Sequence, residues 1–275
     1  MPVIALAAFV LTVGCGAAGP PHAAASAPPY TATSSPPGPP SPVATVPPLR
    51  VSAAQIGRLP SATTYGTTPT APQDPAPFGT ETGAVVHPTA TRVIFARPGG
   101  SAVATLPATE LGSPTWVPVV RSQPGWDQVL LPTRPNRSTG WIYLGGAGLQ
   151  TAYTPYLVDI NLATYRLTIL DAGRRLGTWT VAEGAAASPT PPGRTFLLAS
   201  LAPTHPTYSP LILPLGVHSR TLTTFGGGPG TVGLHGWPDP AVFGHAVSHG
   251  CVRVPGPALR ALSRVPLGSP VMITG

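Results

Sequence analysis

One short segment near the C-terminus brings together the residue types that nucleophilic chemistry needs. It reads Ser248-His249-Gly250-Cys251, and a further histidine, His235, lies upstream of it. Acyl transfer to or from a peptide requires a nucleophile, a base and hydrogen-bond donors for the developing oxyanion. Cys251 is the candidate nucleophile. Because a free thiol has a pKa of about 8.5, it needs a neighbour that favours the thiolate.

The spacing of these residues suggests individual roles. Residues two apart in an extended segment share a face, so His249 is expected beside Cys251 and, from spacing alone, is the favoured base. Gly250 has no side chain, so a substrate carbonyl can approach the backbone there, and the N–H groups of Gly250 and Cys251 can point at the oxyanion. The Ser248 hydroxyl is expected to orient one of the histidines. Arg253 falls on the same face as Cys251 and can bind a substrate carboxylate.

Metal binding is the main alternative for this cluster. His235, His249 and Cys251 can also act as three zinc ligands with an open fourth position. No fourth ligand is obvious, although His245 is nearby, so we expect no metal and no other cofactor. Asp239 lies between the two motif histidines in a predicted loop, where a solvated carboxylate is a better interpretation than the acid of a triad.

The second cysteine, Cys15, belongs to a different kind of segment. It follows an apolar run from Val3 to Val13, which is too short to span a bilayer but has the length of a signal-peptide core. Residues 11–15, Leu-Thr-Val-Gly-Cys, resemble a bacterial lipobox, which implies cleavage before Cys15 and acylation of its thiol. No basic residue precedes the run, which leaves open that it is not a signal. An ordinary signal peptide with an incidental cysteine is a separate alternative. Residues 1–19 are therefore predicted to be an export signal.

Residues 20–85 are predicted to be a disordered linker. They are rich in Pro, Ala, Ser and Thr, and their sparse apolar residues show no period. Such a composition buries too little apolar surface to offset the loss of chain entropy on folding. A short helix near residues 51–59 is the one exception that the pattern favours.

Residues 86–148 are predicted to be a small β-barrel. Short strands are expected at 92–96, 115–120, 126–131 and 140–143, separated by Gly and Pro. Residues 116–119 (WVPV) and 125–129 (GWDQV) resemble a bacterial SH3-like domain. The tryptophans Trp116, Trp126 and Trp141 can form a ligand platform, but we favour core or interdomain packing.

Residues 153–275 are predicted to form a second β-rich domain. Strands are expected at 157–160, 165–170, through Trp179 and Val181, and at 270–273. A short helix is expected at 258–265, because Pro257 suits a first helical turn. There is no βαβ alternation and no long helix, so we expect a mostly β protein, mostly antiparallel, with little helix.

The motifs of this second domain resemble those of a known family. His235-Gly236 is followed by Gly244 and then by Ser248 to Arg253, and Ser-Pro-Thr-Pro-Pro-Gly stands upstream at 188–193. This arrangement is similar to the YkuD-type L,D-transpeptidase domain over residues 156–273. SH3-like segments often precede that domain in actinobacterial members. Two positions depart from the family pattern, Trp237 and Val247.

The resemblance implies a two-step reaction on peptidoglycan. The Cys251 thiolate attacks the carbonyl of the third residue of a tetrapeptide stem, and the terminal D-alanine leaves. An amine of a second stem then takes the acyl group, which gives a 3→3 cross-link. By the same resemblance His235 replaces His249 as the general base. The Gly236 carbonyl then orients its ring, and His249 shapes the oxyanion region or holds the substrate.

Charge and composition bear on the partners. The net charge is +7, and all 15 basic residues are scattered arginines without a run, which suits an anionic wall better than nucleic acid. We therefore expect peptidoglycan stem peptides as partners, no nucleic acid, an exported location and a membrane contact through a lipid on Cys15. Three alternatives share these features: an L,D-carboxypeptidase, transfer of the stem to a protein amine, and an inactive wall-binding lipoprotein.

Overall fold

The computed structural model describes residues 44–80, 82–205 and 208–275. The predicted signal segment 1–19 and its Cys15 lie outside these residues. The described chain is mostly β, as predicted, with two short α-helices, α1 (Ala53–Ile56) and α2 (Gly256–Leu262). Within these three ranges, no helix is both long and apolar enough to cross a bilayer.

The segment 44–80 corrects the expected linker, because it is packed rather than disordered. Ala62, Thr64 and Thr68 are almost fully buried. The Ala62 N–H donates to the Thr105 carbonyl at 2.7 Å, and the Thr68 N–H donates to the Arg134 carbonyl at 2.7 Å. The sheet that follows buries the small side chains of this segment, so the segment needs no apolar period of its own. Local composition therefore did not reveal its packing.

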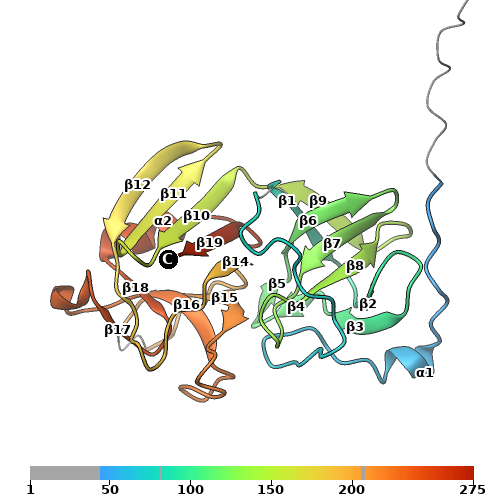
Figure 1. The fold of residues 1–275 in the computed structure, drawn as a ribbon, viewed down its shortest axis with the longest axis horizontal. Helices are drawn as coiled ribbons and strands as arrows, with labels where there is room; N and C mark the ends of the chain where they lie inside the picture. The colour runs from blue at the N-terminus through green and yellow to red at the C-terminus, as the bar shows by residue number, and fades with distance from the viewer. Residues whose placement is uncertain (1–43, 81, 206–207) are drawn as a thin grey trace, which may run out of the picture. The chain divides into compact units, whose positions relative to one another are not determined.

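The first sheet has seven strands in the order β3-β2-β8-β7-β6-β1-β9 and is antiparallel throughout (Figure 1). It extends past the expected bounds of 86–148 at both ends, because β9 pairs with β1. A two-stranded hairpin, β4 with β5, accompanies it. The likeness to an SH3 domain stays a prediction. The strands are β1 (Ala84–Pro88), β2 (Arg92–Phe95), β3 (Ala102–Leu106), β4 (Thr109–Glu110), β5 (Ser113–Pro114), β6 (Val117–Gln123), β7 (Trp126–Leu130), β8 (Thr139–Tyr143) and β9 (Leu149–Tyr153).

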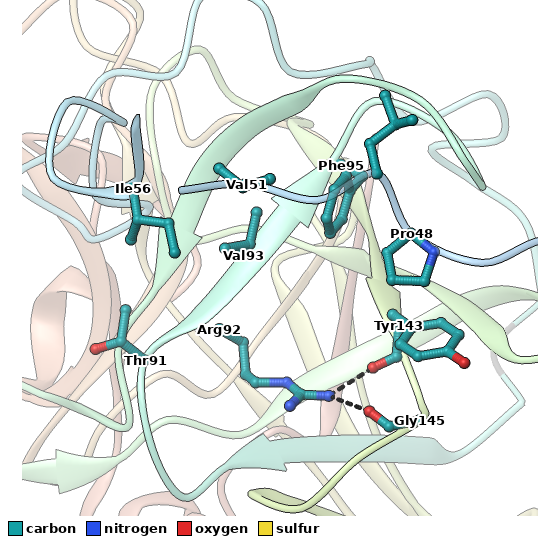
Figure 2. A pocket seen from close by; sticks show the side chains of 10 residues that line it. Pro48, Val51, Ile56, Thr91, Arg92, Val93, Phe95, Tyr143 and Gly145 are labelled. Atoms are coloured by element: carbon teal, nitrogen blue, oxygen red, sulfur yellow. Dashed lines mark hydrogen bonds between the residues drawn. The ribbon is translucent and has the colours of Figure 1, made fainter. Parts of the chain in front are cut away.

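Two of the three tryptophans pack in this part of the chain, as favoured from the sequence. Trp126 and Trp141 are buried in a cluster with Phe95. The Trp126 Nε1–H donates to the Val46 carbonyl at 2.7 Å, which fastens the start of the 44–80 segment. A shallow pocket remains beside this cluster, where the Arg92 guanidinium donates to carbonyls at its rim (Figure 2).

The second part of the chain contains two main sheets. A five-stranded sheet has the order β12-β11-β10-β19-β14, and a three-stranded sheet has the order β15-β16-β18. Three strand pairs are parallel: β10 with β19, β16 with β18, and β13 with β17. The other four pairs are antiparallel, as expected. The sequence did not predict the parallel pairs, two of which lie at the centre of the two main sheets. The strands are β10 (Tyr156–Asn161), β11 (Arg166–Asp171), β12 (Arg174–Thr180), β13 (Glu183–Gly184), β14 (Gly193–Phe196), β15 (Ile212–His218), β16 (Thr231–Gly236), β17 (Ala246–Ser248), β18 (Val252–Val254) and β19 (Pro270–Thr274).

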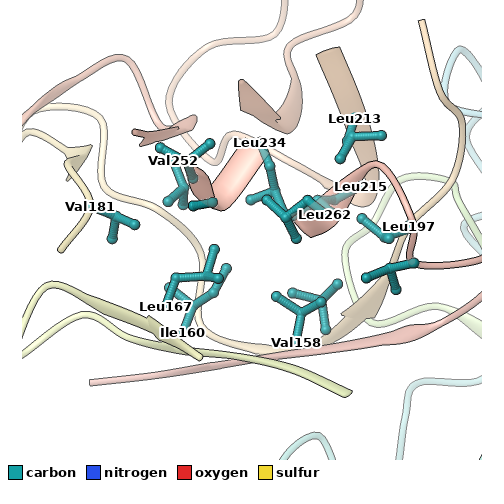
Figure 3. Close-up of a cluster of buried hydrophobic side chains, with 14 of the residues drawn as sticks. Val158, Ile160, Leu167, Val181, Leu197, Leu213, Leu215, Leu234, Val252 and Leu262 are labelled. Carbon is teal, nitrogen blue, oxygen red and sulfur yellow. The ribbon is translucent and has the colours of Figure 1, made fainter. Parts of the chain in front are cut away.

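One apolar core joins these two sheets and α2. Figure 3 shows Val158 and Ile160 of β10 on one side and Leu234 of β16 and Val252 of β18 on the other, with Leu262 of α2 between the layers. Each of these five side chains is fully buried. Burial of one such side chain contributes on the order of 2 kcal/mol, so this core fixes the position of β16 and β18.

A buried ion pair ties the 44–80 segment to β14. The Arg194 Nε and Nη2 groups donate to the two Asp74 carboxylate oxygens at 2.6 and 2.7 Å, and both side chains are almost completely shielded from solvent. Removal of one partner from such a pair leaves a charge in a low-dielectric site, which is strongly destabilising.

We expect Asp74→Ala to lower the free energy of unfolding by about 3–5 kcal/mol. Chemical denaturation of the full chain would measure it. The matched control is Asp171→Ala, which removes the exposed pair with Arg174 and should cost well under ~1 kcal/mol. Equal losses in the two variants would show that the segment is not part of the folded unit.

Candidate active site

The register between β16 and β18 brings the candidate nucleophile and base to the same face. The strands run parallel, with Leu234 opposite Val252 and His235 opposite Arg253. Leu234 and Val252 point into the apolar core. Successive side chains on a strand alternate between faces, so His235 and Arg253 point away from the core, as does Cys251 immediately before β18.

The His235 ring is held in one orientation. It is buried, and its Nδ1 lies 2.9 Å from the Gly236 carbonyl. Since a carbonyl only accepts, Nδ1 carries the proton and Nε2 is left as the basic nitrogen. The Gly236 N–H in turn donates to the Ser209 hydroxyl at 2.7 Å, so Ser209 helps to fix the His-Gly turn. The resemblance predicted the Gly236 contact, but no sequence signal pointed to Ser209.

The environment keeps both reacting groups neutral. Burial lowers the pKa of His235, the Gly236 hydrogen bond opposes this shift, and the Arg253 charge adds to it. Burial raises the pKa of the Cys251 thiol, although a hydrogen bond with the Gly233 backbone and the Arg253 charge partly oppose the rise. The resting state favoured by these shifts is a neutral thiol beside a neutral imidazole, not a preformed ion pair.

Ser248 has a different role from the one expected. Its hydroxyl donates to the Cys251 carbonyl at 2.5 Å and accepts the Gly250 N–H at 3.0 Å, so it shapes the backbone turn rather than orienting a histidine. The Gly250 N–H was expected to point at the oxyanion, but it is bound to the Ser248 hydroxyl instead. Gly250 has a φ of +114°, a conformation that other residues rarely adopt.

The motif at 188–193 holds the backbone turn at 248–251 through hydrogen bonds. The Ser188 hydroxyl donates to the Ser248 carbonyl at 3.1 Å, and the Thr190 hydroxyl donates to the Gly250 carbonyl at 2.9 Å. Thr190 Oγ1 also accepts the Gly184 N–H at 2.9 Å. The resemblance predicted that this segment belongs to the domain, and the contacts show that it holds the cysteine turn.

Arg253 lies between an aromatic ring and the cysteine. Its guanidinium carbon is 3.6 Å from the centre of the Trp237 ring, a cation–π contact. Trp237, one of the two departures from the family pattern, thus positions the cation. Burial raises the pKa of Tyr208, and the Cys251 charge adds to the rise, so Tyr208 is a site residue that sequence reasoning missed. The Tyr208 and His235 rings meet edge to face at 4.9 Å.

The His249 ring contacts an aromatic side chain of a neighbouring loop. The ring stacks on Phe225, with 4.9 Å between ring centres. Both roles expected for His249, the one from spacing and the one from the resemblance, stay predictions. Phe225 is half exposed and belongs to the loop at 219–230, which contributes to the same cavity.

The candidate reactive side chains line one cavity of about 480 Å³, together with Tyr208, Phe225 and Trp237. It contains Cys251, His235, His249, Ser248 and Arg253, so the structure brings together the predicted site residues apart from the two glycines, which shape its turns. Across the chain from 44 to 275, leaving out the three undescribed positions, no group of three His, Cys, Asp or Glu side chains could hold a metal. Asp239 is exposed and caps a short 3-10 helix, η1 (Pro240–Val242), as a loop carboxylate.

The shifted thiol pKa predicts how Cys251 reacts with an alkylating reagent. The rate of iodoacetamide modification should rise with pH to a midpoint above the ordinary cysteine value of about 8.5, because burial disfavours the thiolate. Mass spectrometry of the modified peptide at a series of pH values measures this rate. A rate that is already constant at pH 7 would indicate a preformed thiolate–imidazolium pair.

The support under the cysteine turn can be tested separately. Thr190→Val keeps the volume but removes both hydrogen bonds, so the Gly184 N–H and the Gly250 carbonyl lose their partner. We expect a loss of about 1–3 kcal/mol in stability and a slower alkylation of Cys251. Thr168→Val, which removes an exposed hydrogen bond to Thr178, is the control and should change neither.

Comparisons with known proteins match the C-terminal part of the chain to one family. The family model of the L,D-transpeptidase catalytic domain, YkuD, matches residues 155–273. The chain therefore carries a YkuD-type L,D-transpeptidase catalytic domain in its C-terminal part. No curated protein matches the chain.

The solved structures that match part of the chain include three L,D-transpeptidases. One from Mycobacterium tuberculosis H37Rv is 14% identical over 51% of this chain and 73% of its own, with a TM-score of 0.37. One from Mycobacterium smegmatis is 17% identical over 58% and 82%, with a TM-score of 0.37. The catalytic domain of the E. faecium enzyme is 21% identical over 43% and 95%, with a TM-score of 0.33.

Proposed function

We propose that this protein is a peptidoglycan L,D-transpeptidase that forms 3→3 cross-links through an acyl-enzyme on Cys251. The observation that carries the proposal is the parallel register of β16 and β18. It presents Cys251, His235 and Arg253 to one cavity from one face. The YkuD match supports the reaction class, and the geometry supports the roles proposed for the residues.

In the first step the Cys251 sulfur attacks the carbonyl carbon of the third residue of a tetrapeptide stem. The thiol proton passes to His235 Nε2, the nitrogen left basic by the Nδ1 contact with Gly236. As the tetrahedral intermediate collapses, the bond to the terminal D-alanine breaks, and His235 returns the proton to the leaving amine. A thioester on Cys251 remains.

In the second step an amine of another stem attacks the thioester. His235 takes a proton from this amine, and the Cys251 sulfur leaves and is reprotonated. Because the Gly250 N–H is bound to Ser248, the backbone N–H of Cys251 is the donor assigned to the oxyanion. Arg253, held over Trp237, binds a carboxylate of the stem.

The site of action follows from the proposed substrate. Peptidoglycan stems lie outside the cytoplasmic membrane, so we propose an exported protein, in line with the apolar run before Cys15. Lipid attachment at Cys15 stays a prediction from the sequence.

Incubation of the purified protein with a disaccharide-tetrapeptide tests the function. The wild type should give a 3→3 linked dimer by mass spectrometry, and Cys251→Ala should give none. His235→Asn should slow the reaction by about 10²–10⁴-fold, because the general base is lost. His245→Asn, an exposed histidine outside the cavity, is the matched control and should keep full activity.

Other outcomes separate the alternatives. A tripeptide product instead of a dimer would indicate an L,D-carboxypeptidase, in which water resolves the same acyl-enzyme. A labelled protein amine would indicate transfer to protein. Unchanged cross-linking by Cys251→Ala would overturn the proposal.

A further inference from the structure

Three residues from outside the matched domain line the active-site cavity. Thr64 and Tyr65 come from the segment that precedes the first sheet, and Leu111 comes from the turn between β4 and β5. The YkuD match begins only at residue 155. Part of the wall of the proposed substrate site is therefore built by the N-terminal half of the chain.

All polar groups of Thr64 are bound, and its carbonyl and hydroxyl are bound to the catalytic part. His218 Nε2 lies 2.7 Å from the Thr64 carbonyl and 3.0 Å from its hydroxyl. The Thr64 hydroxyl also lies 2.5 Å from the hydroxyl of Thr231, the first residue of β16. Its N–H donates to the Glu110 carboxylate. Thr64 is buried, so this wall is a constant part of the cavity and not a loose loop.

Tyr65 stands at the surface end of this wall. The Gly66 N–H donates to the Thr63 carbonyl at 2.8 Å, which closes a tight turn. A Cβ on Gly66 would lie 2.0 Å from the Ser61 carbonyl oxygen, so only glycine fits there. The Tyr65 side chain is 67% exposed, although it lines the cavity, and is therefore available to a ligand.

The N-terminal half also holds a second wall of the cavity. The Arg134 guanidinium donates to the carbonyls of Ser219, Leu222 and Pro229 at 3.1, 3.2 and 2.9 Å. These contacts fasten both ends of the loop at 219–230, which carries the exposed Phe225. Tyr65 and Phe225 are thus two aromatic side chains that line one cavity and remain largely open to solvent.

We propose that Tyr65, with Thr64 and Leu111, forms a second subsite that takes the N-terminal part of the donor peptide stem, upstream of its scissile carbonyl. This inference rests on the proposed function. It makes Tyr65 a specificity-determining residue contributed by the chain that precedes the catalytic domain.

The distribution of charge gives the orientation of the stem. Arg253, the cation that lines the cavity, is two residues from Cys251 and lies opposite His235 in the pairing of β16 with β18. Thr64 contacts Thr231, at the other end of β16, and four residues of strand span about 13 Å. The side chains that line this end of the cavity are uncharged, and the Glu110 carboxylate behind Thr64 is not part of the lining. A stem whose carboxylate binds Arg253 and whose scissile carbonyl meets Cys251 therefore extends its preceding residues toward Tyr65.

The experiment compares two substrates with the full chain. One is the tetrapeptide stem, and the other is its C-terminal dipeptide, which has the scissile bond but lacks the upstream residues. We expect Tyr65→Ala to raise the KM for the tetrapeptide by about five- to tenfold, as expected for loss of one aromatic contact. The KM for the dipeptide should not change. Tyr153→Ala is the matched control, because Tyr153 is 69% exposed and lies outside the cavity.

A binding measurement separates this inference from the function itself. In the Cys251→Ala background, calorimetric titration with the tetrapeptide should show weaker binding when Tyr65→Ala is added. If the wild type failed to cross-link but this difference remained, the subsite would stand and the reaction would be wrong. Equal effects of Tyr65→Ala and Tyr153→Ala, or an equal effect of Tyr65→Ala on both substrates, would overturn the subsite. Circular dichroism of both variants controls for folding.

Discussion

The parallel pairing of β16 with β18 is the constraint on which the site depends. A shift of this register by one residue would turn Leu234 or Val252 out of the core and would turn His235 or Cys251 into it. The core therefore selects the register, because this register buries four apolar side chains of the two strands at once: Val232, Leu234, Val252 and Val254. The candidate site lies on the opposite face of the same strands. Burial of the apolar face therefore also fixes the position of His235, Cys251 and Arg253, whose side chains lie outside the core.

Burial also sets the proton chemistry. In a site shielded from water the charged forms of both Cys251 and His235 are disfavoured, which raises the thiol pKa and lowers the imidazole pKa. In the proposed mechanism such a neutral pair transfers its proton during attack, so the orientation of His235 by Gly236 matters more than a stored thiolate. The Arg253 charge lowers the pKa of Cys251, which opposes the effect of burial, and it also lowers the pKa of His235, which adds to the effect of burial. The Trp237 ring holds the Arg253 guanidinium in this place.

The sequence predicted the parts of the site that lie in short local patterns. The Ser248 to Cys251 motif, His235 and the main strands of the second domain were found because each depends on neighbouring residues. The role of His249 could not be found from spacing, because the turn at Gly250, with its positive φ, breaks the extended geometry that the argument assumed. Ser209 and Tyr208 were missed because they reach the site through contacts with residues distant in sequence.

The segment at 44–80 shows most clearly where composition misleads. Its Pro-rich sequence cannot form a core alone, and this was the correct physical premise. The premise does not extend to a segment that lies against an existing sheet, because the sheet supplies the apolar surface and rigid prolines lose little entropy on binding. Asp74 and Thr64 then supply polar contacts that match buried partners in the catalytic part, Arg194 and His218. Loss of the segment would remove the Asp74 carboxylate from this buried ion pair and would open the cavity beside Thr231. Stability and the shape of the cavity therefore depend on the same stretch of chain, which lies outside the domain that carries the candidate catalytic motif.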